Sequence, residues 1–170
     1  GRIIIGGSYG AMGIGLPYAI GASISNNKGV VYCITGDGGL QMNIQELETV
    51  KREKLPIKIL VVNNRELGKI SEIQHGSYGD RYCITTAESG YTVPDFEKIA
   101  TAYGIKASTL QLYEELEEYK QWLNDDEPCL LNIMIPSLTP LIPKIQWETG
   151  TIKPDLDEVT FEKVHLLIGD

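Results

Sequence analysis

Two turns that follow apolar, strand-like runs carry side chains suited to binding a metal ion together with a phosphate. The first turn reads Gly36-Asp37-Gly38-Gly39, and the second reads Asn63-Asn64-Arg65-Glu66. Glycines let backbone N–H groups approach an anion closely, whereas Asp37 would repel a bare phosphate. The Asp is explained if it holds a divalent cation that bridges to the phosphate, and an Asn side chain supplies the kind of carbonyl oxygen that Mg²⁺ or Ca²⁺ accepts as a ligand.

The spacing of the two turns along the chain strengthens this prediction. Either turn on its own is more often an ordinary turn than a binding site. Asn64 lies 27 residues after Asp37 (64 − 37), a length that the helix and strand of a βαβ unit fill naturally. Ligands of an open parallel sheet bind beyond the carboxyl ends of its strands, so both turns are expected at one edge of the sheet.

Two further segments have distinctive patterns. Residues 10–22 read GAMGIGLPYAIGA, and residues 94–104 read PDFEKIATAYG. Together with GDG and NN, these segments resemble thiamine-diphosphate-dependent enzymes of the acetolactate synthase, pyruvate oxidase and pyruvate decarboxylase branch. That branch typically shows GxMGxGLPxAIGA and PDFxKxAxAYG. The resemblance covers about residues 1–136 and implies the C-terminal, diphosphate-binding domain of an acetolactate-synthase-like enzyme.

The resemblance implies a role for each matching position. Mg²⁺ would be bound by Asp37, by the Asn64 side chain and by the backbone carbonyl of Glu66. Met12 would hold the cofactor in its bent shape, although ordinary core packing is an equal alternative without the motif. Bound thiamine diphosphate would supply the nucleophile and electron sink of the reaction. The remaining implied cofactor-binding positions are Gly10, beside the aminopyrimidine, Gly38 and Gly39, whose N–H groups would face the diphosphate, and Gly36 and Gly68.

The catalytic Glu of this family, which activates the cofactor, lies on a different domain and usually on a second subunit. We therefore expect no catalytic residue in this chain and no turnover by the 170 residues alone. The implied partners are the pyrimidine-binding domain of the same or another subunit, in a homodimer or homotetramer, and a small 2-oxo acid substrate. FAD, where present, would bind a middle domain outside this sequence.

The helix expected after Asn64 carries the candidate substrate residues Lys69, Ile70 and Ile73. Acetohydroxyacid synthases usually have Gln where this chain has Leu67 and Trp where it has Ile73. This departure leaves the expected activity as that of a lyase or transferase, a decarboxylase or carboligase, acting on an unidentified 2-oxo acid. Lys69 is also consistent with an ordinary solvated surface lysine.

The elements that position these residues alternate between strand-like and helix-like runs, which predicts a doubly wound α/β fold. We expect a parallel sheet of about six strands with helices on both faces. The predicted strands include residues 2–5, 30–35, 57–62, 105–110 and 129–135, and the predicted helices include residues 16–25, 43–53, 95–102 and 112–123. Residues 75–92 are predicted to form a loop. Residues 137–170 are predicted to form an extended C-terminal tail, with Trp147 as a packing anchor or part of an active-site lid.

Charge and composition exclude several classes of function. The chain has 15 basic and 23 acidic residues and a net charge of −8, which disfavours binding to nucleic acid or to anionic membranes. No apolar run approaches the length of a membrane span. Its three cysteines show no CxxC pattern, so a reducing, cytoplasmic compartment is predicted.

Three alternatives remain open from the sequence. A nicotinamide-binding Rossmann domain would explain a glycine-rich turn before a helix, but Gly10, Gly13 and Gly15 do not follow the GxGxxG spacing. A non-catalytic module could keep the fold without the cofactor. A two-chain enzyme could have its pyrimidine-binding domain on a separate polypeptide.

Overall fold

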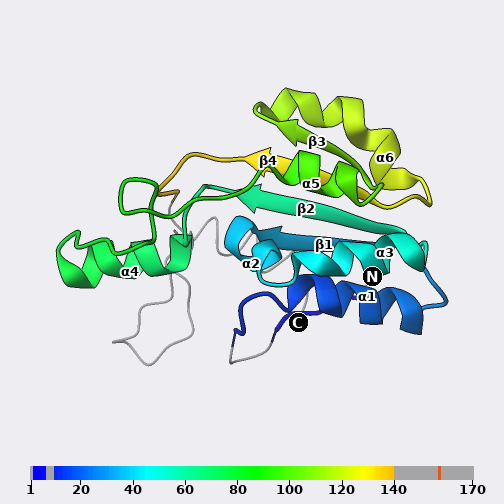
Figure 1. The fold of residues 1–170 in the computed structure, drawn as a ribbon, viewed down its shortest axis with the longest axis horizontal. Coiled ribbons are helices and arrows are strands. Elements are labelled where there is room, and N and C mark those ends of the chain that lie inside the picture. The colour runs from blue at the N-terminus through cyan, green and yellow to red at the C-terminus, as the bar shows by residue number, and fades with distance from the viewer. Residues whose placement is uncertain (1, 7–9, 140–156, 158–170) are drawn as a thin grey trace. The chain divides into compact units, whose positions relative to one another are not determined.

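The computed structural model describes residues 2–6, 10–139 and 157 (Figure 1). The described part alternates between strands and helices, as the sequence predicts. In chain order the elements are α1 (Gly15–Ser25), β1 (Val31–Gly36), α2 (Asp37–Gln41), the 3₁₀ helix η1 (Ile44–Glu46), α3 (Leu47–Arg52), β2 (Ile57–Asn63), α4 (Gly68–Tyr78), α5 (Phe96–Ala102), β3 (Lys106–Leu110), the 3₁₀ helix η2 (Tyr113–Tyr119), α6 (Lys120–Asn124) and β4 (Cys129–Met134).

The four strands form one parallel sheet in the order β1-β2-β4-β3, which confirms the predicted α/β fold class. Gly36 at the end of β1 pairs with Val62, and Asn63 at the end of β2 pairs with Met134. The GDG and NN turns therefore leave adjacent strands at the same edge of the sheet. Figure 1 shows α4 projecting from this edge, beyond the carboxyl ends of the strands.

The predicted number of strands is wrong for the described residues, which form four strands rather than about six. Residues 2–5 were counted as a strand because of their β-branched run, but Ile3 to Ile5 are largely exposed and take no part in the ladder. A β-branched segment becomes a strand only when a neighbouring strand pairs with it.

One face of the sheet carries the main apolar core. Residues that alternate along the strands, such as Cys33, Ile59 and Leu130, point into this core and are buried. The helices α1, α2, α3 and α5 cover it. Their buried contributions are Leu16, Ala19 and Ile20 from α1, Leu40 from α2, Leu47 and Val50 from α3, and Phe96 and Ala100 from α5.

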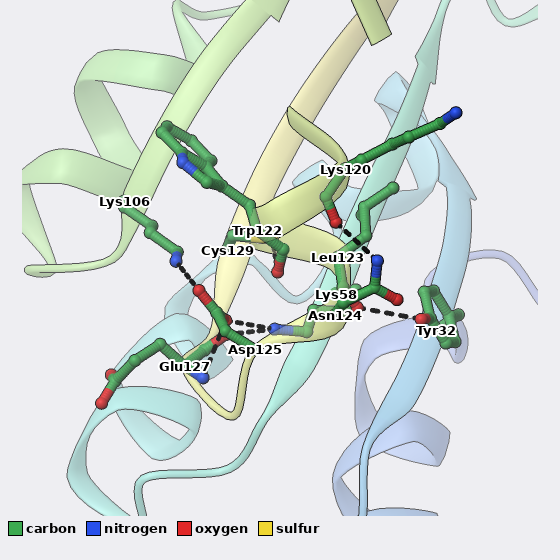
Figure 2. A network of polar contacts seen from close by, with 10 residues as sticks. All are labelled: Tyr32, Lys58, Lys106, Lys120, Trp122, Leu123, Asn124, Asp125, Glu127 and Cys129. Carbon is green, nitrogen blue, oxygen red and sulfur yellow. Dashed lines mark hydrogen bonds and ion pairs between the residues drawn. The ribbon is translucent and has the colours of Figure 1, made fainter. Parts of the chain in front are cut away.

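The opposite face is covered in part by η2 and α6. The Tyr32 hydroxyl on β1 donates to the Leu123 carbonyl of α6 (Figure 2), and the Ser108 hydroxyl on β3 lies 2.7 Å from the Tyr119 hydroxyl of η2. Tyr32 and Ile34 of β1 are nevertheless exposed. Lys58 of β2 is fully buried and donates to Asp125 Oδ1 at 2.8 Å and to the backbone carbonyl of Glu127 at 2.5 Å. Lys106 of β3 pairs with the other carboxylate oxygen of Asp125 and lies over the Trp122 ring. These contacts confirm the prediction of helices on both faces.

Several element boundaries differ from the predictions. The helix predicted at residues 95–102 is α5, and Asp95 is its N-cap, because the Asp95 side chain accepts the Lys98 N–H at 3.0 Å. The predicted helix at residues 43–53 is divided into η1 and α3, and the predicted helix at residues 112–123 begins as the 3₁₀ helix η2. The predicted loop at residues 75–92 is wrong at its start, because α4 continues to Tyr78.

The described residues contain no helix long and apolar enough to cross a membrane. All three cysteines are free thiols. The predicted lid residue Trp147 and nearly all of the predicted tail lie outside the described residues.

Candidate functional site

Asp37 is the central side chain of the site and is almost completely buried, with 2% of its surface exposed. It is the first residue of α2, directly after β1. Its Oδ1 accepts the N–H of Gly38 at 2.5 Å and the hydroxyl of Tyr91 at 3.3 Å. Its Oδ2 is buried and has no hydrogen-bond partner among the described residues. Buried polar atoms are normally paired, so this oxygen is available to a ligand such as a cation.

Burial raises the pKa of Asp37 above its ordinary value, because desolvation disfavours the charged carboxylate. Nearby polar groups act in the opposite direction: the Gly38 N–H and the Tyr91 hydroxyl donate to Oδ1, and the N–H groups of Arg65 and Glu66, which donate to Asn63 and Asn64, lie near the carboxylate. The second turn therefore lies close to the carboxylate of the first. A bound divalent cation would favour the ionised form and offset the cost of burying it.

The NN turn is held by its own side chains. Asn63 donates to Asn132 Oδ1 on β4 at 3.0 Å and accepts the Arg65 N–H at 3.0 Å. Asn64 Oδ1 accepts the Glu66 N–H at 3.2 Å. Arg65 has a left-handed backbone (φ +58°), which is unusual for a residue other than glycine. Asn63 is therefore a structural residue of the turn, while Asn64 is half-buried.

The side chain of Glu66 is buried and fixes neighbouring segments. One of its oxygens accepts from Ser71 Oγ at 3.3 Å and from the Leu138 N–H at 3.1 Å. This carboxylate therefore joins the start of α4 to the segment after β4. The predicted metal ligand at this position is the backbone carbonyl, whose role stays a prediction.

Gly38 lies at a point where three other segments converge. A Cβ at this position would lie 2.6 Å from Met12 Cε, 2.8 Å from Leu67 Cδ2 and 3.0 Å from the Tyr91 hydroxyl. No side chain fits there without displacing these groups. The structure thus brings Met12 to the GDG turn, where the Gly38 N–H is directed to Asp37.

The other predicted glycines occupy distinct places around the same turns. Gly36 precedes α2 as its N-cap, and a Cβ on Gly39 would lie 2.7 Å from Thr35 Oγ1. Gly68 begins α4, where a Cβ would lie 2.7 Å from Asn64 Nδ2. Gly10 is exposed, and no atom of the described residues lies within 4 Å of its Cβ position.

The candidate substrate residues lie on α4 as expected. Ile70 and Ile73 line a hollow of about 550 Å³ together with Gln74, Tyr78 and Arg81. Lys69 instead forms an exposed ion pair with Glu72 at 3.2 Å. Ile70, Ile73 and the Tyr78 ring form the apolar part of its lining, and Gln74, Arg81 and the Tyr78 hydroxyl form the polar part.

Sequence reasoning missed Tyr91, which lies in the polar stretch predicted to be a loop. No spacing rule connects it to Asp37, from which it is separated by 54 residues. The one available signal was an aromatic residue among polar neighbours shortly before Pro94.

Comparison with known proteins identifies the family. Residues 1–133 match the family model described as thiamine pyrophosphate enzyme, C-terminal TPP binding domain. The chain belongs to this family. Thiamine pyrophosphate is the same compound as thiamine diphosphate, so the match favours the predicted cofactor over the nicotinamide alternative.

Relatives of this thiamine pyrophosphate enzyme domain support the assignment. The acetolactate synthase isozyme 2 large subunit of Escherichia coli is 39% identical over 146 residues, which are 84% of this chain and 26% of that protein. The probable acetolactate synthase large subunit of Methanocaldococcus jannaschii is 37% identical over 167 residues, which are 90% of this chain and 28% of that protein. A solved thiamine diphosphate-dependent 4-hydroxybenzoylformate decarboxylase from Rhodococcus jostii superposes with a TM-score of 0.63 at 26% identity, covering 76% of this chain and 24% of that chain. The chain spans about a quarter of the length of these proteins and is an acetolactate-synthase-like C-terminal TPP-binding domain.

Proposed function

We propose that this domain binds thiamine diphosphate through a Mg²⁺ ion held between the GDG and NN turns. The observation that supports this most strongly is the buried Oδ2 of Asp37, which lies close to the NN turn and has no hydrogen-bond partner among the described residues. A carboxylate, an amide oxygen and a backbone carbonyl are hard ligands suited to Mg²⁺, which commonly shares its coordination with phosphate oxygens.

The residues of this chain would bind and orient the cofactor. Asp37, the Asn64 side chain and the Glu66 carbonyl would hold Mg²⁺. The absence of side chains at Gly38 and Gly39 would let the backbone of this turn approach the diphosphate closely. Met12, from the segment before α1, would support the cofactor. Gly10, Gly36 and Gly68 would be the remaining cofactor-binding positions. The bound cofactor supplies the nucleophilic carbon and the electron sink that 2-oxo acid chemistry needs.

We infer that the complete enzyme is an acetolactate-synthase-like lyase or transferase, a decarboxylase or carboligase of a 2-oxo acid. Ile70 and Ile73 would contact the apolar part of the substrate, and Lys69 would come near its carboxylate if it left Glu72. The activating Glu would come from a pyrimidine-binding domain, and the enzyme would be a cytoplasmic homodimer or homotetramer. We expect no turnover from the 170 residues alone.

The test is a calorimetric titration of the enzyme that contains this chain with thiamine diphosphate, with and without Mg²⁺. We expect Mg²⁺-dependent binding to the wild type and a loss of at least about 100-fold in affinity for Asp37→Asn, since the anionic ligand is removed. Asp80→Asn is the matched control, because this exposed carboxylate pairs with His75. Binding by Asp37→Asn that equals wild type would refute the metal assignment.

A further inference from the structure

The hydroxyl of Tyr91 lies beside two residues of the proposed Mg²⁺-diphosphate site. It donates to Asp37 Oδ1 at 3.3 Å and lies 3.0 Å from the position that a Cβ on Gly38 would occupy. Tyr91 comes from the segment between α4 and α5, so a third part of the chain reaches the GDG turn. Neither the motif spacing nor the NN turn assigns this residue a role.

The two oxygens of Asp37 differ in their surroundings. Oδ1 receives both donors, the Gly38 N–H and the Tyr91 hydroxyl, whereas Oδ2 receives none among the described residues. A carboxylate held by two donors at one oxygen has a fixed orientation, and its other oxygen is free to coordinate. We propose that Tyr91 is a positioning residue, whose hydroxyl holds Oδ1 of Asp37 so that Oδ2 binds the cation. This inference rests on the proposed function.

The turn that carries Tyr91 is itself fixed to the site. The Tyr91 N–H donates to the Thr86 carbonyl at 2.9 Å, and Ser89 Oγ accepts from the Thr85 and Thr86 N–H groups at 3.0 and 2.9 Å. The Thr85 carbonyl in turn accepts the N–H of Leu67, the residue before α4, at 2.9 Å. Because Leu67 follows the NN turn closely, the segment holding Tyr91 is anchored to one of the two turns while its hydroxyl reaches the other.

Tyr91→Phe in the complete enzyme tests this role, because it removes the hydroxyl and keeps the ring. Mg²⁺ would be titrated calorimetrically at saturating thiamine diphosphate. We expect the Mg²⁺ affinity to fall about tenfold, the lower end of what a hydrogen bond to a charged group contributes. We also expect a tenfold higher Mg²⁺ concentration to restore wild-type binding of thiamine diphosphate, because the cation can still order Asp37. The matched control is Tyr82→Phe, whose hydroxyl donates to the exposed Asp80 at 3.1 Å and which should bind Mg²⁺ like the wild type.

Three results with Tyr91→Phe would overturn the inference. Unchanged Mg²⁺ affinity would mean that the hydroxyl does not hold Asp37. Tighter Mg²⁺ binding would mean that the hydroxyl competes with the cation. Weaker binding that excess Mg²⁺ does not restore, with a lower melting temperature of the ligand-free protein, would indicate a purely structural role. In all three, Mg²⁺-dependent binding by the wild type keeps the proposed function intact, whereas its absence from the wild type refutes the proposed function itself.

Discussion

A charged side chain is buried at each end of the sheet, and the two side chains differ in whether the chain supplies their hydrogen-bond partners. At the carboxyl ends of the strands, Asp37 has one carboxylate oxygen without a partner among the described residues. At the amino end of β2, Lys58 is fully buried and donates to both Asp125 and the Glu127 carbonyl (Figure 2). A buried charged group whose hydrogen-bond partners all come from the chain supports the fold, whereas a buried charged group with an unpartnered atom indicates a binding site for a ligand.

The charged groups around Lys58 form a connected network of hydrogen bonds and ion pairs. Asp125 accepts from Lys58 at one oxygen and from Lys106 at the other, and its Oδ1 also accepts the Glu127 N–H at 3.0 Å. Desolvation acts to raise the pKa of Asp125, but the hydrogen bonds from Lys106 and Lys58 outweigh it and hold this pKa well below its usual range. The shift is opposite to that of Asp37, whose desolvation is not outweighed. The network fastens α6 and the turn after it to the sheet.

The largest expected effect on stability comes from Asp125→Ala. This substitution leaves the ammonium of Lys58 buried with the Glu127 carbonyl as its one hydrogen-bond acceptor among the described residues (Figure 2), and breaking a buried pair by removing one partner costs about 3 kcal/mol or more. We expect urea unfolding of the protein to show a free energy of unfolding reduced by about that amount.

Lys58→Met provides the control for this prediction. Replacing the buried lysine by an apolar side chain of similar length removes the ammonium that has lost its carboxylate partner. The double variant Lys58→Met/Asp125→Ala should therefore be more stable than Asp125→Ala alone. A double variant that is no more stable than Asp125→Ala would show that the two residues are not coupled through charge.

The second prediction concerns Asp37→Asn and has the opposite sign. Because the pKa of Asp37 is raised in the folded protein, the charged carboxylate destabilises the ligand-free fold at neutral pH. We expect Asp37→Asn to be slightly more stable than the wild type at pH 7 without Mg²⁺. This advantage should shrink as the pH falls through the raised pKa, because the wild-type carboxyl then becomes neutral.

For Asp125→Asn, we expect the difference in stability from the wild type to have the opposite sign over the same pH range. The lowered pKa of Asp125 means that its stabilisation is present above its ordinary value of 3.8 and is lost as the pH falls further. Asp125→Asn should therefore be less stable than the wild type at pH 7, with the difference narrowing in acid. Chemical denaturation at each pH measures both differences, and the same sign for the two variants would contradict the comparison.

Much of the fold could be predicted because its signals are local. Strand-like runs predicted β1, β2, β3 and β4, and the helix predicted at residues 95–102 corresponds to α5. Residues 2–5 have the same type of signal but lack a pairing partner in the described structure, so composition alone misassigned them. The boundary of α4 was missed because its polar sequence has little apolar periodicity.

The site was only partly predictable for the same reason. The GDG and NN turns are short sequence signals at the ends of adjacent strands, and the register of β1 with β2 brings them together. The contact of Tyr91 with Asp37 depends on how residues 79–91 return to the sheet, which no local pattern specifies. The Lys58–Asp125 pair joins residues 67 positions apart, and no local pattern indicates that a lysine inside an apolar strand is fully buried.

The smallest expected effect is that of Lys106→Met. Lys106 donates to the same carboxylate as Lys58 and lies 5.2 Å from the centre of the Trp122 ring, but its side chain is 31% exposed. Water can replace part of what is lost, so we expect a decrease of about 1 kcal/mol, or a melting temperature lower by about 2–4 °C for a chain of this size. Lys98→Met is the control, because Lys98 pairs with Asp95 at 2.9 Å on a far more exposed surface and should change stability by less. Equal losses for the two variants would mean that Asp125 is satisfied by Lys58 alone and that the network ends at that pair.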